Sequence, residues 1–333
     1  MSRPIDSLQA SYNACRRIGR GSRSNLYFGF PWLEGARRHG MDALYAFARL
    51  TDDLADSDLQ VDERRRQLTN WRQALEGALG APGRTSSEAP GAASSSGTND
   101  PEDAYGLMPS IAAAIALPAV TDMVQRFSVP PRHLFALIDG AEMDLDRNRY
   151  ETAEDLEAYC RCVASSIGLT CVHIWGYHDD AVFAPAEKCG IALQWTNILR
   201  DVKEDLARNR VYLPQTDLRK HQVTEADLRG GAADARFHSL MADMIDRTKT
   251  YYREGFPVLQ WLEPDGRRMC GVILDRYRAL LDAIERRPEV VLQRRIHLPV
   301  GTKARLTLRW FFRGRTAMPR GCVASRARNE NIV

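Results

Sequence analysis

The sequence predicts an all-α protein, and three observations carry this prediction. Almost every patterned segment repeats its apolar residues at the helical period, and these segments are too long for strands. No stretch alternates apolar and polar residues between turn residues, as a β-hairpin requires. The 333 residues, 44% hydrophobic and 27% charged, have the composition of a soluble globular protein with a substantial core.

Eight segments carry the helical pattern and predict the helices of the protein in chain order. The first, 33–55, places apolar side chains at Met41, Leu44 and Phe47, on one face of a helix. The predicted helices are 33–55, 59–79, 111–127, 131–145, 156–175, 185–206, 237–259 and 268–284.

One stretch, 81–104, interrupts the helical pattern. It is rich in Ser, Ala, Gly and Pro and has no periodicity, so we predict a flexible surface loop inserted between two helices. The expected organisation is one helical domain over residues 1–310 and a basic, disordered tail over residues 311–333. Gly314 and Pro319 are expected to end the last helix.

The distribution of charge and cysteine excludes several classes of protein. The net charge is +3, but the chain from Arg294 onward holds ten basic residues and one acidic residue, so the rest carries −6. An acidic body with a basic tail is not typical of a nucleic-acid-binding domain, and no nucleic acid partner is expected. The seven cysteines are scattered without a C-x-x-C pair. With no secretory signal or apolar run of spanning length, we expect a cytoplasmic protein.

Two similar clusters of carboxylates are the strongest functional feature. Asp52 and Asp56 end the segment LYAFARLTDDLAD, and Asp201 and Asp205 lie within QWTNILRDVKED. Residues four apart on a helix are separated by roughly 40° around its axis, so each pair shares one face. One such pair is common on solvated helices. The repeat of an arrangement in which like charges repel favours a site where a cation compensates them.

Polar residues behind both pairs extend these faces. Gln194 and Asn197 precede Asp201 by seven and four residues, and Tyr45 and Arg49 share the face of Asp52. Mg²⁺ prefers carboxylates, waters and phosphate oxygens as ligands. The two pairs could therefore hold Mg²⁺ around one or two diphosphates.

Four segments resemble the squalene/phytoene synthase family, all-α enzymes that join two prenyl diphosphates head to head. They follow the family's order and spacing between residues 22 and 214, with weaker similarity down to residue 307. The segments are SRSNLYFGF, ALYAFARLTDDLAD, MDLDRNRYETAEDLEAYCRCVASSIGL and LQWTNILRDVKEDLARNRVYLP. The resemblance implies a single-domain isoprenoid synthase-type helical bundle around a central cavity. It also implies a Mg²⁺-dependent condensation through a cyclopropylcarbinyl diphosphate, with release of diphosphate.

The resemblance further implies roles for individual residues. The metal ligands, for Mg²⁺ or alternatively Mn²⁺, would be Asp52, Asp56, Asn197, Asp201 and Asp205. The four aspartates would also be catalytic, together with Tyr45 and Arg49. The substrate-binding residues would be Ser22, Arg49, Tyr150, Val163, Gln194, Asn197, Arg200, Arg210 and Tyr212. Apolar walls from Leu26, Phe30, Val163, Ile167, Leu169 and Leu193 would keep water from the allyl cation.

Three positions depart from the family's pattern. Asn209 stands where Gly is frequent, and because Asn tolerates a left-handed backbone we expect the turn to persist. Trp195 stands where Leu is common and either reshapes the cavity or fills the core. Ser165 replaces a frequent Gly. These differences bear on the length of the product and leave the reaction class unchanged.

The segment Lys303–Arg315, KARLTLRWFFRGR, interleaves Arg with Leu, Trp and Phe. One interpretation is a peripheral contact with anionic membrane lipid. The other is a last helix with an exposed basic face and a frayed end.

Alternatives also remain for the reaction. Two farnesyl diphosphates giving presqualene diphosphate or a squalene-type product are expected first, and two geranylgeranyl diphosphates giving phytoene second. A terpene cyclase or a non-catalytic assembly factor would be another class of protein. The use of NADPH stays open, since no nucleotide-binding pattern follows a predicted strand.

Overall fold

The computed structural model describes residues 5–21, 33, 35–80 and 109–313. These residues form helices and connections without any strand, and only two isolated bridges, Arg149–Val211 and Tyr177–Leu262, join extended residues. This confirms the predicted all-α class. The loop 81–104, the tail from residue 314 and the site residue Ser22 lie outside the described residues and stay predictions.

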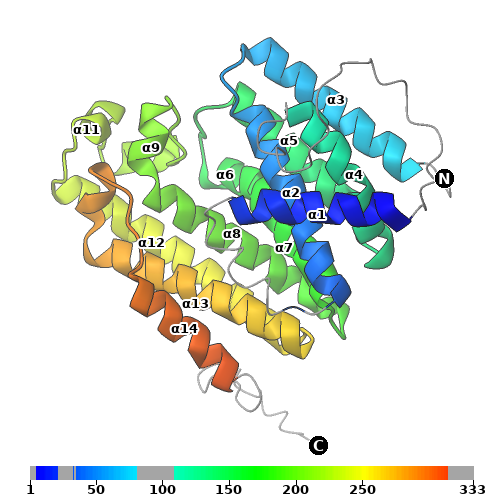
Figure 1. Cartoon of the computed structure of the whole chain (residues 1–333). Coiled ribbons are helices and arrows are strands. Elements are labelled where there is room, and N and C mark those ends of the chain that lie inside the picture. Colours follow the sequence, from blue (N-terminus) through cyan, green and yellow to red (C-terminus); the bar gives the residue numbers. More distant parts are fainter. Residues whose placement is uncertain (1–4, 22–32, 34, 81–108, 314–333) are drawn as a thin grey trace, which may run out of the picture.

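Figure 1 shows the arrangement of the helices in space. The α-helices are α1 (Ile5–Gly21), α2 (Gly35–Ala55), α3 (Val61–Gly80), α4 (Pro109–Arg126), α5 (Arg132–Asp146), α6 (Ala153–Cys160), α7 (Ser166–Trp175), α8 (Phe183–Arg200), α9 (Val202–Ala207), α10 (Gln215–Lys220), α11 (Glu225–Arg229), α12 (Ala235–Gly255), α13 (Pro264–Arg286) and α14 (Val300–Arg313). A π-helical segment, η3 (Arg161–Ser165), joins α6 to α7, and the 3₁₀ turns are η4 (Asp180–Val182), η5 (Phe256–Gln260) and η6 (Pro288–Leu292).

Two helices organise the bundle from its interior. α8 packs against α7, α12 and α13, and α2 packs against α1, α4 and α5, while α7 contacts both (Figure 1). Large side chains such as Phe47, Trp195 and Phe237 are completely buried between them. Each contributes about 1.5–3 kcal/mol by leaving water, so packing against neighbours decides where these helices lie.

Several predicted helices have the wrong extent, because packing modifies the local pattern. The segment 185–206 is not one helix: Asp201 has φ −101° and ψ 16° and separates α8 from α9. The hydrogen bonds from Asp201 N to Asn197 O and from Asp205 N to Asp201 O, both 2.9 Å, nevertheless carry the turn across the break. The segment 156–175 is likewise divided by η3. The short helices α10 and α11, and α1, were not predicted.

Close packing around α8 accommodates two departures from the family's pattern. A Cβ on Gly190 of α8 would lie 2.4 Å from the Cα of Ser165, so only Gly allows this approach. The Ser165 hydroxyl donates to the Glu187 carbonyl at 2.8 Å, which accommodates Ser at a frequent Gly position. Trp195 is fully buried, with the Arg247 guanidinium 5.3 Å from its ring. It therefore fills the core.

Among the residues described, no helix is long and apolar enough to cross a membrane. The six described cysteines are free thiols. α14 continues to Arg313, so the last helix extends three residues into the predicted tail.

Candidate active site

A cavity of about 1180 Å³ opens between α2, η3, α7, α8 and α13. Its polar end holds Arg49, Asp52, Asp53, Gln194, Asn197 and Arg200. Apolar side chains form much of the remaining wall, including Met41, Leu44, Val163, Ile167, Leu193, Ile273 and Leu280. A long hydrocarbon chain can thus lie in the same cavity as an anionic head group.

The first carboxylate pair lies at the end of α2. The Asp52 carboxylate faces water inside the cavity, although protein surrounds most of it. Burial and the neighbouring Asp56 raise its pKa to about 7. Arg49 does not neutralise it directly, because its guanidinium pairs with Asp53 at 2.6 Å. Asp52 therefore forms no ion pair with the described residues.

The second pair lies where α8 meets α9. Asp201 accepts from Arg200 Nε at 2.6 Å and from Arg295 Nε at 2.7 Å. Asp205 has no arginine partner among the described residues, and burial together with the charge of Asp201 raises its pKa to about 7. Each pair thus contains one carboxylate bound by arginine and one in need of a cation.

The turn after α9 connects the two pairs. Arg208 Nη1 and Arg210 Nη2 reach Asp56 at 3.2 and 3.1 Å. Between them Asn209 has φ +58°, which confirms the left-handed turn expected for Asn at this position. The end of α2 and the α9 turn therefore meet.

Asp144 of α5 is a third carboxylate, which the sequence analysis missed. Its oxygens accept from the Tyr159 and Tyr212 hydroxyls, both at 2.8 Å, and burial raises its pKa. Its charge also raises the pKa values of Asp52 and Asp205, so it lies near both pairs. A sequence signal existed: Asp144 continues the buried face of α5, where an acid is unexpected.

Asn197 and Tyr150 offer polar atoms without partners. Asn197 Nδ2 donates to Gln194 Oε1 at 3.3 Å, while its buried Oδ1 has no hydrogen bond within the described chain. The Tyr150 ring stacks on Tyr212 with centroids 5.8 Å apart, and its buried hydroxyl also lacks a partner. Unsatisfied buried acceptors are uncommon in folded proteins and indicate a missing ligand.

The chemistry of these residues fits a Mg²⁺ site. Unpaired carboxylates with raised pKa values and an orphaned amide oxygen are suitable hard ligands. Across the described residues, no three His, Cys, Asp or Glu side chains form a metal-binding group by themselves.

The structure brings most of the predicted site residues together. Seven of them line the cavity: Tyr45, Arg49, Asp52, Val163, Gln194, Asn197 and Arg200. The carboxylate cluster beside it contains Asp56, Asp201, Asp205 and Arg210, and Tyr212 with its neighbour Tyr150. The unpredicted members are Asp53, Asp144, Tyr159, Arg208 and Arg295. Arg295 lies in a non-helical connection, where no periodicity could have identified it.

The all-α bundle and the carboxylates at one end of an apolar cavity define an isoprenoid synthase. Sequence comparison agrees: residues 19–302 match the squalene/phytoene synthase family. A 15-cis-phytoene synthase from Synechocystis is 30% identical over 91% of this chain and 85% of its own length. Phytoene synthase from Arthrospira platensis is 32% identical over 88% of this chain and 90% of its own length. Phytoene synthase from Mycobacterium tuberculosis is 31% identical over 91% of this chain and 91% of its own length.

Solved structures share the fold. A dehydrosqualene synthase in complex with a ligand superposes with a TM-score of 0.76 and 24% identity over 95% of this chain and all of its own. Squalene synthase from Alicyclobacillus acidocaldarius gives a TM-score of 0.70, with 24% identity over 86% of this chain and 98% of its own. The chain belongs to the squalene/phytoene synthase family, whose members are prenyltransferases that condense prenyl diphosphates head to head.

Proposed function

We propose that this prenyltransferase condenses two prenyl diphosphates head to head through a cyclopropylcarbinyl diphosphate, with Mg²⁺ as cofactor and release of diphosphate. The observation that carries the proposal is the meeting of two carboxylate pairs around Asp144, at the polar end of a cavity with apolar walls. A terpene cyclase would share the carboxylates, and a non-catalytic assembly factor would have no need to keep them.

The metal would be held by the two aspartate pairs and by the amide oxygen of Asn197. We assign Asp52, Asp56, Asn197, Asp201 and Asp205 as ligands, and Mn²⁺ suits the same oxygens. When bound, the ion supplies Lewis-acid assistance to the departing diphosphate. Asp144, held by two tyrosine hydroxyls, adds negative charge between the pairs and keeps the site attractive to cations.

Arginines beside the aspartate pairs would bind the phosphate oxygens. Arg200 and Arg210 already lie against site carboxylates, at 2.6 Å from Asp201 and 3.1 Å from Asp56. The guanidinium group also suits bidentate contacts with phosphate. Arg49 at the mouth of the cavity extends this set.

The apolar part of the cavity would protect the carbocation. Val163, Ile167 and Leu193 line it, as the resemblance implies, and exclude water that would trap the cation. Tyr45 also lines the cavity, and the π face of its ring would stabilise positive charge. Leu169, also expected in the wall, is not among the residues that line the cavity. Leu26 and Phe30 lie outside the described residues.

The length of the substrate is the finer part of the proposal. The curated relatives cited above are named phytoene synthases, which supports geranylgeranyl diphosphate as substrate and phytoene as product. The segments MDLDRNRYETAEDL and YCRCVASSIGL instead favour farnesyl diphosphate, the second candidate. Specificity constants for the two substrates, each with and without NADPH, test this choice. A higher kcat/KM for the twenty-carbon substrate is expected, and the reverse ranking would assign farnesyl diphosphate.

Peripheral contact with membrane lipid through Lys303–Arg315 also belongs to the proposed function. Prenyl diphosphates and their hydrocarbon products partition into membranes, so contact would shorten their transfer. The exposed side chains of α14 support this part of the proposal.

A further inference from the structure

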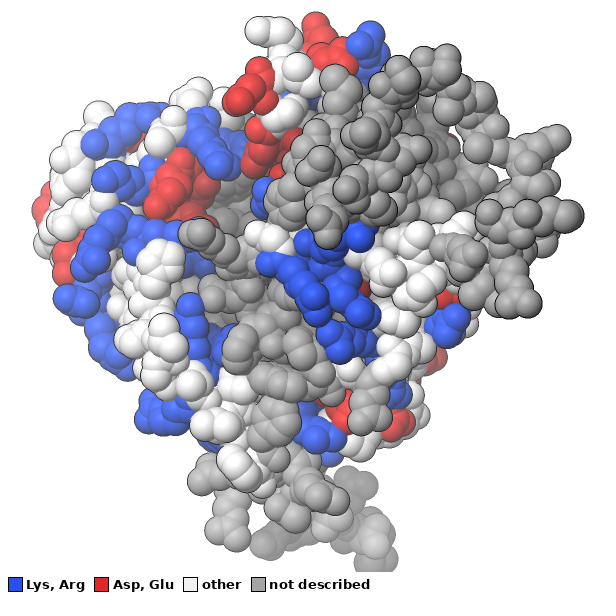
Figure 2. Space-filling view, in the orientation of Figure 1, with Lys and Arg blue, Asp and Glu red and all other residues white. Residues whose placement is uncertain are grey.

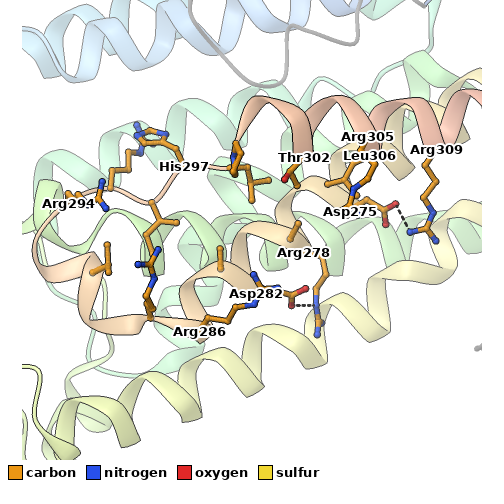
Figure 3. Close-up of a pocket in the computed structure, with 18 residues that line it drawn as sticks. Asp275, Arg278, Asp282, Arg286, Arg294, His297, Thr302, Arg305, Leu306 and Arg309 are labelled. Atoms are coloured by element: carbon orange, nitrogen blue, oxygen red, sulfur yellow. Dashed lines mark hydrogen bonds and ion pairs between the residues drawn. The ribbon is translucent and has the colours of Figure 1, made fainter.

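A second hollow lies outside the candidate active site, between α13, α14 and the connection that joins them (Figure 3). Its volume is about 650 Å³. Seven arginines line it, together with two aspartates and His297. The arginines of this groove are Arg278, Arg286, Arg287, Arg294, Arg295, Arg305 and Arg309.

The positive charge of the groove is largely uncompensated. Arg278 pairs with Asp282 at 3.1 Å, Arg309 lies 3.9 Å from Asp275, and Arg295 binds Asp201 (Figure 3 shows the first two contacts). The other four arginines, Arg286, Arg287, Arg294 and Arg305, are exposed and form no ion pair with the described residues. Such a cluster binds anions, because guanidinium groups converge on phosphate oxygens.

The outer face of α14 beside this groove is apolar. Val300, Leu308 and Phe312 are 82%, 53% and 81% exposed, and they are the three most exposed large hydrophobic side chains of the described chain. With Ala304 they repeat every four residues and form a stripe along the helix. Large apolar side chains gathered on a solvent-facing helix mark an interaction surface.

The orientation of α14 is fixed from its inner side. Trp310 donates to Asp275 at 2.7 Å and packs where a Cβ on Gly271 would lie 2.4 Å from its ring. Arg276 Nη2 donates to the Thr307 hydroxyl at 2.8 Å. Tight packing against α13 therefore holds the apolar stripe outward.

We propose that the groove binds the phosphate head groups of anionic phospholipids while the apolar stripe inserts among their acyl chains. This inference rests on the lipid contact in the proposed function and assigns its site. Charge and apolar side chains together select the partner, since a nucleic acid would leave the stripe exposed to water. On the lower left of the molecule, where α14 lies, Figure 2 shows Lys and Arg interspersed with uncharged side chains.

The groove also adjoins the active-site cavity. Arg295, Ile296, His297 and Leu298 line both hollows. A membrane bound at α14 would therefore lie directly beside the cavity wall, where hydrocarbon chains are handled.

Co-sedimentation with vesicles tests the site. The full chain should bind vesicles of phosphatidylcholine mixed with phosphatidylglycerol, and bind vesicles of phosphatidylcholine alone much more weakly. The triple variant Arg286→Gln, Arg294→Gln, Arg305→Gln should bind the anionic vesicles about 100-fold more weakly. The stripe variant Leu308→Ser, Phe312→Ser should lose tenfold or more. A matched control, Arg66→Gln, Arg219→Gln, Arg253→Gln, removes equal charge elsewhere and should retain most binding.

Three results would overturn the inference: equal binding to both kinds of vesicle, equal loss in the groove and control variants, or association of the chain with itself through the stripe in place of vesicle binding. Turnover of detergent-dispersed prenyl diphosphate is measured on the same proteins. It separates a failure of lipid binding from a failure of the proposed reaction. The groove variant should keep that turnover, which also shows that it folds.

Discussion

At the scale of single residues, the carboxylates differ in what surrounds them. Asp144 and Asp146 come from the same MDLD segment. Asp146 is exposed and pairs with Arg65 at 2.6 Å. Asp144 accepts hydrogen bonds from two tyrosine hydroxyls and lies near both aspartate pairs. Composition does not distinguish two such acids. Only their positions on α5, on the exposed or the buried face, separate them.

The substitution Asp144→Asn tests this difference. Removing the charge while keeping an acceptor for a tyrosine hydroxyl should weaken metal affinity by about 10–100-fold, as for other groups that support metal ligands. The Mg²⁺ concentration for half-maximal turnover is the measurement. Asp146→Asn is the matched control and should change it little, and an equal change in both variants would contradict the role of Asp144.

The substitutions Asp52→Asn and Asp201→Asn test the proposed ligands themselves. Each should lower kcat about 100-fold or more, because the charge that develops on the leaving diphosphate loses its compensation. Glu204→Gln changes an exposed acid next to the second pair and should have little effect. Circular dichroism should show unchanged helix content in all three, and full activity in either aspartate variant would refute the metal role.

At the scale of helices, periodicity predicted α2 to α5 closely, since each has a continuous apolar face toward the core. It did not predict η3 or the break at Asp201, because these depend on how α8 approaches its neighbours. α1 was missed because its buried face includes small and polar residues such as Ser11, Ala14 and Cys15.

The contact between α8 and η3 gives a test at this scale. Gly190→Ala places a Cβ against the Ser165 backbone, and such overpacking should lower the free energy of unfolding by about 1–3 kcal/mol. In contrast, Gly77→Ala on α3 meets no atom within 4 Å and should raise it by about 0.5–1 kcal/mol. Urea unfolding measures both free energies. Equal effects of the two substitutions would contradict the described packing.

Two histidines between α5 and α7 give a pH dependence. Burial, with Arg132 and His173 nearby, lowers the pKa of His133 to about 4, and burial lowers that of His173. The folded state thus binds fewer protons than the unfolded state, so this contribution to stability is present above about pH 6.5 and is lost toward pH 4. In thermal melts, His133→Gln should reduce the fall of Tm over this range. The exposed control His238→Gln should leave the fall of Tm unchanged. If His133→Gln also leaves the fall of Tm unaltered, His133 does not cause this pH dependence.

At the scale of the whole molecule, the sequence predicted both carboxylate pairs because each is local to one segment. It could not show that the α9 turn joins Asp56 to Arg210, since these residues are 154 positions apart. The basic excess after Arg294 was likewise visible as composition. Its division into a groove and an apolar stripe depends on how α14 packs against α13.

Together, the two aspartate pairs are proposed to serve one head-to-head condensation. The most direct measurement is the carbon number of the product formed from a single prenyl diphosphate, with Mg²⁺ and after its removal by chelation. We predict a product with twice the carbons of the substrate, formed only with the metal and lost in Asp52→Asn and Asp201→Asn. A terpene of unchanged carbon number, or a head-to-tail diphosphate, would contradict the account.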